Sequence, residues 1–180
     1  MDCFAFLGGR AMIRLMFVSC VLFLLSPKNG YPAPTGFIKD PAAFFSKEAI
    51  RQANQEIREI KKRYNTEIRI DTVLKAPSGN TPSDTSGKNM DPVFSDWARK
   101  RSSVTKPKSI YLVISKEPAY LMAAIGSELR AKGEFTQNDR DAMIRLVADN
   151  FQQRNFNKGL LDAVRFVRGA IDASIHGRSK

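Results

Sequence analysis

The stretch SIYLVISKEPAYLMAAIG, residues 109–126, decides the fold of this chain. Its first part, 109–115, is an almost unbroken apolar run, which is typical of a strand covered on both faces. The tight turn Lys116-Glu117-Pro118 follows, and residues 119–125 form a second apolar run. The two runs therefore predict a β-hairpin, and helices elsewhere in the chain must cover it.

Upstream of the hairpin, the sequence predicts two helices and a strand. Ser46 is a suitable cap for a helix in which apolar residues recur at three- and four-residue steps as far as Tyr64. Residues 67–74 alternate between apolar and polar, as in a strand with one buried face. A surface loop rich in Ser, Gly, Pro, Thr and Asn is expected over 76–90. The short helix expected after this loop buries Phe94, Trp97 and Ala98.

Downstream of the hairpin, the sequence predicts two more helices. Thr136 is a good cap for the first, whose apolar residues keep helical spacing to Phe151. The second begins near Asn157 and buries apolar side chains as far as Ile171. The order helix, strand, helix, hairpin, helix, helix predicts an α/β fold, a mixed β-sheet covered by helices in a single domain.

An apolar leader precedes this domain. The run LMFVSCVLFLL, residues 15–25, follows Arg10 and Arg14, and it has the length and basic flank of a signal peptide. It is short for a membrane span, although a retained anchor stays open as an alternative. We expect an exported protein, periplasmic or extracellular, that is secreted or tethered. The expected division is a signal peptide or membrane anchor over 1–30, a linker over 31–36, the domain over 37–173 and a polar tail over 174–180.

The composition excludes several kinds of chemistry. The two cysteines, Cys3 and Cys20, lie in the leader, so the domain has no disulfide partner and no thiolate for metal binding or catalysis. The single histidine, His176, lies in the polar tail, which argues against a Ser-His-Asp triad. A net charge of +11 suits an anionic lipid surface or an acidic partner. Export argues against nucleic acid.

Several stretches resemble the TPM domain family, which is named for thylakoid-lumen, photosystem-repair and acetylcholine-receptor-modulating proteins. Four segments carry the likeness, and the positions of Phe151 and Gly159-Leu160 add to it. The resemblance implies a single TPM-like domain, exported or membrane-tethered, that acts in membrane-protein maintenance or receptor modulation. Weak phosphatase activity has been attributed to some members. The four segments are FIKD (37–40) with FSKE (45–48), RYNTEI (63–68), FSDW (94–97), and SIYLVI (109–114) with AIGSEL (124–129).

The same resemblance implies acidic residues that hold a metal ion at the edge of the sheet. The candidates here are Asp40, Glu128 and Asp139, and the expected cofactor is a divalent cation, calcium or magnesium, which prefers several converging oxygens. The match has departures: 104–109 lacks the usual acidic, glycine-containing pattern, and Asp139 substitutes for an acid expected near Gln137-Asn138. The alternative is that the three carboxylates are solvated surface groups.

A basic run suggests a second surface. Arg99, Lys100 and Arg101 are followed by Lys106 and Lys108. Each basic residue near an anionic membrane contributes about 1 kcal/mol of binding. The alternative is an ordinary helix end, where the helix dipole favours cations.

Three functions follow from these observations. The first is a non-enzymatic binding module for an envelope protein or a membrane surface. The second is a weak metal-dependent phosphatase that uses an acidic pocket. The third is a structural domain without a ligand.

Overall fold

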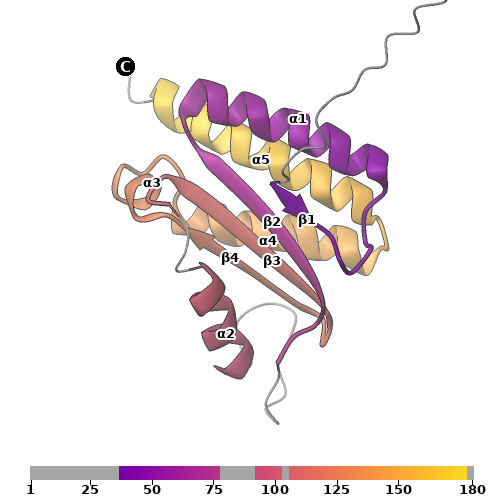
Figure 1. Cartoon of the computed structure of the whole chain (residues 1–180). Helices are drawn as coiled ribbons and strands as arrows, with labels where there is room; N and C mark the ends of the chain where they lie inside the picture. Colours follow the sequence, from indigo (N-terminus) through magenta and orange to yellow (C-terminus); the bar gives the residue numbers. More distant parts are fainter. Residues whose placement is uncertain (1–36, 78–91, 103–105, 178–180) are drawn as a thin grey trace, which may run out of the picture. The chain divides into compact units, whose positions relative to one another are not determined.

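A computed structural model describes residues 37–77, 92–102 and 106–177 of this chain (Figure 1). These ranges contain four strands and five helices. In chain order they are β1 (Ile38–Lys39), α1 (Lys47–Tyr64), β2 (Glu67–Lys75), α2 (Pro92–Ser102), β3 (Ser109–Glu117), β4 (Tyr120–Ile125), α3 (Ser127–Ala131), α4 (Gln137–Gln152) and α5 (Phe156–Gly177).

The strands form one mixed sheet in the order β1-β2-β3-β4. β1, β2 and β3 run parallel, and β4 runs antiparallel to β3, with Ser115 opposite Tyr120 at the turn. The predicted hairpin and the predicted mixed sheet are confirmed. β1 was not predicted, because its two residues are too short to produce a periodic pattern; Ile38 pairs with Ile70 of β2.

Helices cover both faces of the sheet, as the unbroken apolar run of β3 predicts. Ile110, Leu112 and Ile114 belong to the core formed with α1, α4 and α5. The alternate residues Tyr111 and Val113 belong to a smaller core under α2. In Figure 1, α1 and α5 lie side by side on one face, and α2 lies apart from them.

The local signals for the helices are also confirmed. The Ser46 hydroxyl accepts a hydrogen bond of 3.1 Å from the Ala49 N–H at the start of α1. Asn65 ends this helix in the left-handed conformation, with φ 54°. Thr136 and Asp139 form a reciprocal capping box at the start of α4.

The amino-terminal end of β3 is closed by close backbone packing. The Gly126 N–H donates to the Ser109 carbonyl at 2.7 Å, and the Glu128 N–H donates to the Pro107 carbonyl at 2.9 Å. A Cβ at Gly126 would lie 2.2 Å from the Pro107 carbonyl oxygen, so only glycine fits there. The Lys108–Glu134 ion pair, at 3.1 Å, lies beside this contact. We call this region the closed end.

The carboxyl-terminal boundary of the domain differs from the prediction. We expected a polar tail over 174–180, but α5 continues to Gly177. The Ser174 hydroxyl donates to the Glu134 carbonyl at 3.1 Å, and Ile175 packs partly buried against the core. These tertiary contacts extend the helix into a stretch whose composition alone is typical of a fraying end.

Several predictions fall outside the described residues. They are the leader over 1–30, the linker over 31–36, most of the loop over 76–90 and the final residues 178–180. Within the described ranges, every helix is too short or too polar to cross a membrane.

Candidate functional site

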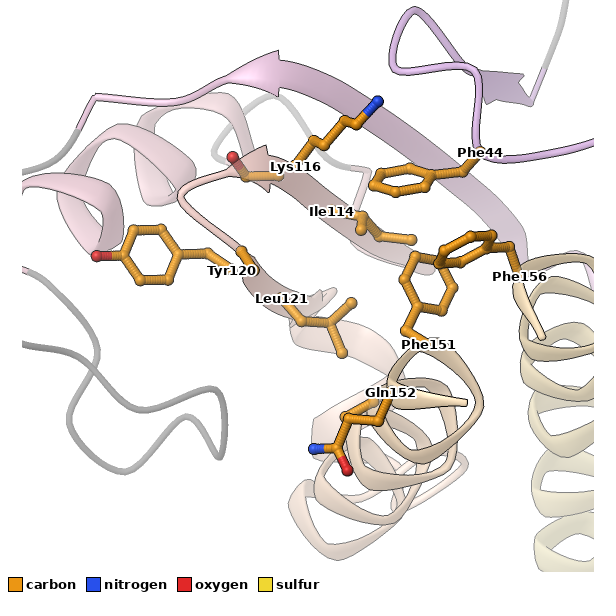
Figure 2. Close-up of a pocket in the computed structure, with 11 residues that line it drawn as sticks. Phe44, Ile114, Lys116, Tyr120, Leu121, Phe151, Gln152 and Phe156 are labelled. Carbon is orange, nitrogen blue, oxygen red and sulfur yellow. The ribbon is translucent and has the colours of Figure 1, made fainter. Parts of the chain in front are cut away.

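An apolar pocket of about 250 Å³ lies at the end of β3 opposite the closed end (Figure 2). It lies where β3 and β4 approach the last turn of α4 and the first turn of α5, and we call this region the open end. Its apolar lining comes from segments far apart in the sequence. The principal side chains are Phe44, Ile114, Leu121, Phe151 and Phe156.

Three phenylalanine rings form one wall of the pocket. The ring centroids of Phe44 and Phe151 are 5.2 Å apart, those of Phe44 and Phe156 are 5.2 Å apart, and those of Phe151 and Phe156 are 4.9 Å apart. Tilted and edge-on contacts at these distances are favourable for aromatic rings. The wall is therefore a packed cluster that a ligand can contact without first ordering it.

A glycine in α5 lies against one of these rings. A Cβ at Gly159 would lie 3.1 Å from the Asn150 Cβ and 3.3 Å from the Phe151 ring. The absence of a side chain at this position lets the start of α5 lie close to the end of α4. The resemblance pointed to Gly159 and Phe151, and the structure shows that they meet beside the pocket.

Asp40 holds the third ring in place. Its carboxylate accepts hydrogen bonds from the N–H groups of Phe44, at 3.1 Å, and Phe45, at 2.8 Å. It also accepts one of 2.6 Å from the Thr72 hydroxyl, which in turn accepts from the Ala42 N–H at 3.1 Å. These bonds attach the turn before α1 to β2, and they orient Phe44 over the pocket.

Lys116 places a positive charge at the pocket. Its Nζ lies 5.9 Å from the centroid of the Phe44 ring, within the range of a cation–π contact. It is the only charged side chain among the described residues that line the pocket. Figure 2 shows it extending above Phe44. The lining supplies apolar contact and one cation, which suits an occupant with an apolar group next to an anion.

The structure does not bring the predicted metal ligands together. Asp40 bonds to Thr72, which is opposite Ile114 of β3, whereas Glu128 bonds through its N–H to Pro107, before the start of β3. Residues 109–113 of β3 lie between Pro107 and Ile114, and five strand residues span roughly 17 Å. In the described ranges, no group of three or more His, Cys, Asp or Glu residues could hold a metal ion.

Each of the two remaining carboxylates has a local partner. Glu128 pairs with Lys132 at 2.8 Å, and this hydrogen bond lowers the pKa of Glu128. Asp139 accepts from the Thr136 N–H at 2.8 Å and from its hydroxyl at 2.6 Å, within the capping box. The metal site stays a prediction, without support from this geometry.

The predicted basic surface is largely engaged within the domain. Arg101 pairs with Asp71, Lys106 with Glu67 and Lys108 with Glu134, at N···O distances of 3.2, 2.8 and 3.1 Å. Arg99 reaches Asp96 at 3.7 Å, and Lys100 is exposed on α2. Contact of this surface with anionic lipid also stays a prediction.

A buried polar cluster under α2 escaped sequence reasoning. Asp71 is only 5% exposed, and its carboxylate accepts from the Tyr111 hydroxyl at 2.9 Å and from Arg101. Burial raises the pKa of Tyr111. An aspartate on the polar side of an alternating strand is typical of an exposed residue, whereas here Tyr111 of β3 and Arg101 of α2 contact it.

The sequence analysis also did not identify the pocket residues Phe44 and Phe156. Each of them looks like one more apolar residue beside a helix start. A sequence signal for Phe44 did exist, because it lies between the two family-like segments FIKD (37–40) and FSKE (45–48), four residues after Asp40.

Comparisons with known proteins agree with this fold. The TPM domain family matches residues 38–170. Three similar solution structures are the N-terminal domain of a P. gingivalis protein, the BA42 protein of the psychrophilic bacterium Bizionia argentinensis, and the N-terminal domain of a Corynebacterium glutamicum protein. No curated protein matches this chain.

These three likenesses show the fold alone, because the sequence identities are low. The P. gingivalis domain has a TM-score of 0.57 at 18% identity, with 78% of this chain and 84% of that chain covered. For BA42 the values are 0.50 and 17%, with 73% and 83% covered. For the C. glutamicum domain they are 0.51 and 13%, with 74% and 78% covered.

Proposed function

This chain belongs to the TPM domain family, and we propose that it is an exported, non-enzymatic binding module that holds an envelope protein. The observation that carries the proposal is the pocket at the open end, which combines an aromatic wall with the cation of Lys116. Such a site binds an apolar side chain of a partner and discriminates in favour of a neighbouring carboxylate.

The open end supports a protein partner better than a flat membrane surface. Binding to anionic lipid depends on several cations that face one plane. Here Arg101, Lys106 and Lys108 each lie in an ion pair with a carboxylate of the domain. A concave apolar site of limited volume suits one anchoring side chain, the usual centre of a protein–protein contact.

Site-specific photo-crosslinking in cells tests the proposal. A benzoylphenylalanine at Leu121, inside the pocket, should give an adduct with an envelope protein, and a second change, Lys116→Glu, should weaken that adduct. The same probe at Arg58, on the exposed side of α1, is the matched control. Equal adducts from both positions, or none from Leu121, would contradict the proposed site.

Two further measurements test the other parts of the proposal. Cell fractionation with amino-terminal sequencing should find the protein in the envelope or outside the cell; an intact chain in the cytosol would contradict export. Hydrolysis of a chromogenic phosphate ester should be absent with magnesium, calcium or manganese. Activity that needs one of these ions and is lost in the Asp40, Glu128 and Asp139 alanine variants would establish the phosphatase alternative.

A further inference from the structure

We infer that the occupant of the pocket arrives on an extended segment of the partner that adds as a fifth strand to the outer edge of β4. This inference rests on the proposed function and specifies how the partner binds. It follows from the edge of the sheet, the composition of β4 and the position of Lys116.

Among the described residues, the outer edge of β4 has no strand partner. β4 is the last strand of the sheet, and no described strand pairs with its outer side. The Gly126 N–H points at β3, where it bonds to Ser109. Because backbone groups alternate along a strand, the N–H and C=O groups of Leu121, Ala123 and Ile125 point outward. Strand addition uses such outward groups.

The side chains of β4 do not protect this edge. Natural sheets protect an edge strand with charged residues, prolines or bulges. β4 has the sequence YLMAAI, without a charge or a proline, and four of its six side chains are only partly buried. A partner strand would cover apolar surface as well as pair backbone groups.

The register of an added strand would place one side chain in the pocket. A residue directly opposite Leu121 has its side chain on the same face of the sheet as Leu121, with the two strands about 4.8 Å apart. Leu121 lines the pocket. A cavity of roughly 150 Å³ accepts benzene, so a pocket of about 250 Å³ accommodates one large apolar side chain.

Lys116 specifies the rest of the segment. It lies on the same face as Ile114, since residues two apart in a strand share a face. Leu121 is opposite Ile114, and Lys116 lies two residues after Ile114 in β3. Lys116 is therefore nearer than this pair to the turn between β3 and β4. A partner residue two positions from the anchor would reach this end of the face. A carboxylate there would pair with Lys116. For a segment that runs parallel to β4, the expected pattern is an acid, any residue, then a large apolar residue.

The same charge argument favours a foreign segment over a second copy of this chain. β4 contains no acidic residue, so pairing between two β4 edges would place none of its side chains as a carboxylate partner for Lys116. We therefore commit to an acidic and apolar segment of another protein, and self-association is an outcome of the test.

The test uses the purified full-length chain and the synthetic peptide acetyl-TTETFTVT-amide. Binding is followed by anisotropy of the labelled peptide and by amide hydrogen exchange of the protein. We expect protection to increase at Leu121, Ala123 and Ile125, whose N–H groups point outward. Protection at Tyr120, Met122 and Ala124 should change little, because these N–H groups already face β3.

Backbone N-methylation of the peptide separates strand addition from pocket binding. Methylating one alternate set of amides should weaken binding at least tenfold, while methylating the other set should leave it within about twofold, because only one set faces β4. If both sets are tolerated, strand addition is wrong. Binding of the phenylalanine in the pocket is then supported only if replacing this residue by alanine weakens the binding of the peptide.

Protein variants complete the discrimination. Leu121→Glu and Lys116→Glu should each weaken binding about tenfold, whereas Arg58→Glu on α1 should not. No binding of the parent peptide at about 1 mM overturns strand addition. Sedimentation of the free protein as a dimer that the peptide does not dissociate assigns the edge to a second copy and overturns the inference too. Leu121→Glu binding as well as the native protein contradicts the proposed function itself.

Discussion

The two ends of β3 differ in how they are built. The closed end is packed through backbone contacts, where Gly126 meets Pro107, and through the Lys108–Glu134 ion pair. The open end leaves a pocket, surrounded by phenylalanine rings and one lysine that takes part in a cation–π contact. The clearest motif in the sequence, the segment around Gly126, therefore maintains the architecture. The surface that suits a ligand is assembled from residues of several separate segments that form no single continuous motif.

The largest effect should come from breaking the closed end with Gly126→Ala. The added methyl group would overlap the Pro107 carbonyl, and we expect a loss of about 3 kcal/mol in the free energy of unfolding, measured in urea. Gly169→Ala is the control, because a Cβ at this position of α5 meets nothing within 4 Å. Alanine there should stabilise the protein by about 0.5–1 kcal/mol. Equal stability of the two variants would contradict the packing described.

The next effect contrasts the two lysines. Lys108 and its partner Glu134 expose 20% and 10% of their side chains, so Lys108→Met leaves a buried carboxylate without its cation. We expect a loss of about 2 kcal/mol by urea unfolding. Lys116→Met should change stability by less than about 0.5 kcal/mol, since it removes only one contact at the pocket. A larger loss of stability in Lys116→Met than in Lys108→Met would contradict the proposed difference between the two ends.

Asp40→Ala tests whether the turn before α1 positions Phe44 at the open end. It removes the acceptor for the N–H groups of Phe44 and Phe45 and for the Thr72 hydroxyl, and we expect a loss of about 1.5 kcal/mol together with weaker peptide binding. Asp139→Ala is a matched control that removes a carboxylate bound to backbone N–H at the start of α4, far from the pocket. It should cost about 1 kcal/mol and leave binding unchanged. Normal binding by Asp40→Ala would show that Asp40 does not position Phe44.

The smallest effect should be a pH dependence at the closed end. The hydrogen bond from Lys106 lowers the pKa of Glu67 in the folded protein. A lowered folded pKa contributes stability above the unfolded value, near 4.5, and this stability is lost as the pH falls through the folded pKa. Glu67→Gln should therefore remove about 0.5 kcal/mol at neutral pH and flatten the acid side of the stability curve. Lys116→Met, at the open end, should leave this slope as it is.

Much of the fold could be predicted from the sequence, and little of the site. Ser46 and Thr136 mark helix starts because a cap needs only its own next few residues. The acidic candidates were assigned by resemblance, and Asp40 does lie at the open end, where it bonds to backbone N–H groups. Its role could not be derived from the sequence, because a carboxylate that binds a cation and one that holds a turn are the same residue type.

The hairpin, the long helices and the absence of thiols from the domain follow from the sequence alone, because periodicity, capping and composition are local properties. Three features depend on packing: Phe44, Phe151 and Phe156 share one wall, Arg101 reaches the buried Asp71, and no described strand pairs with the outer edge of β4. The physical reason is distance along the chain. These groups meet only after the parallel strands and their helices have packed, and no short-range pattern encodes which distant residues will meet.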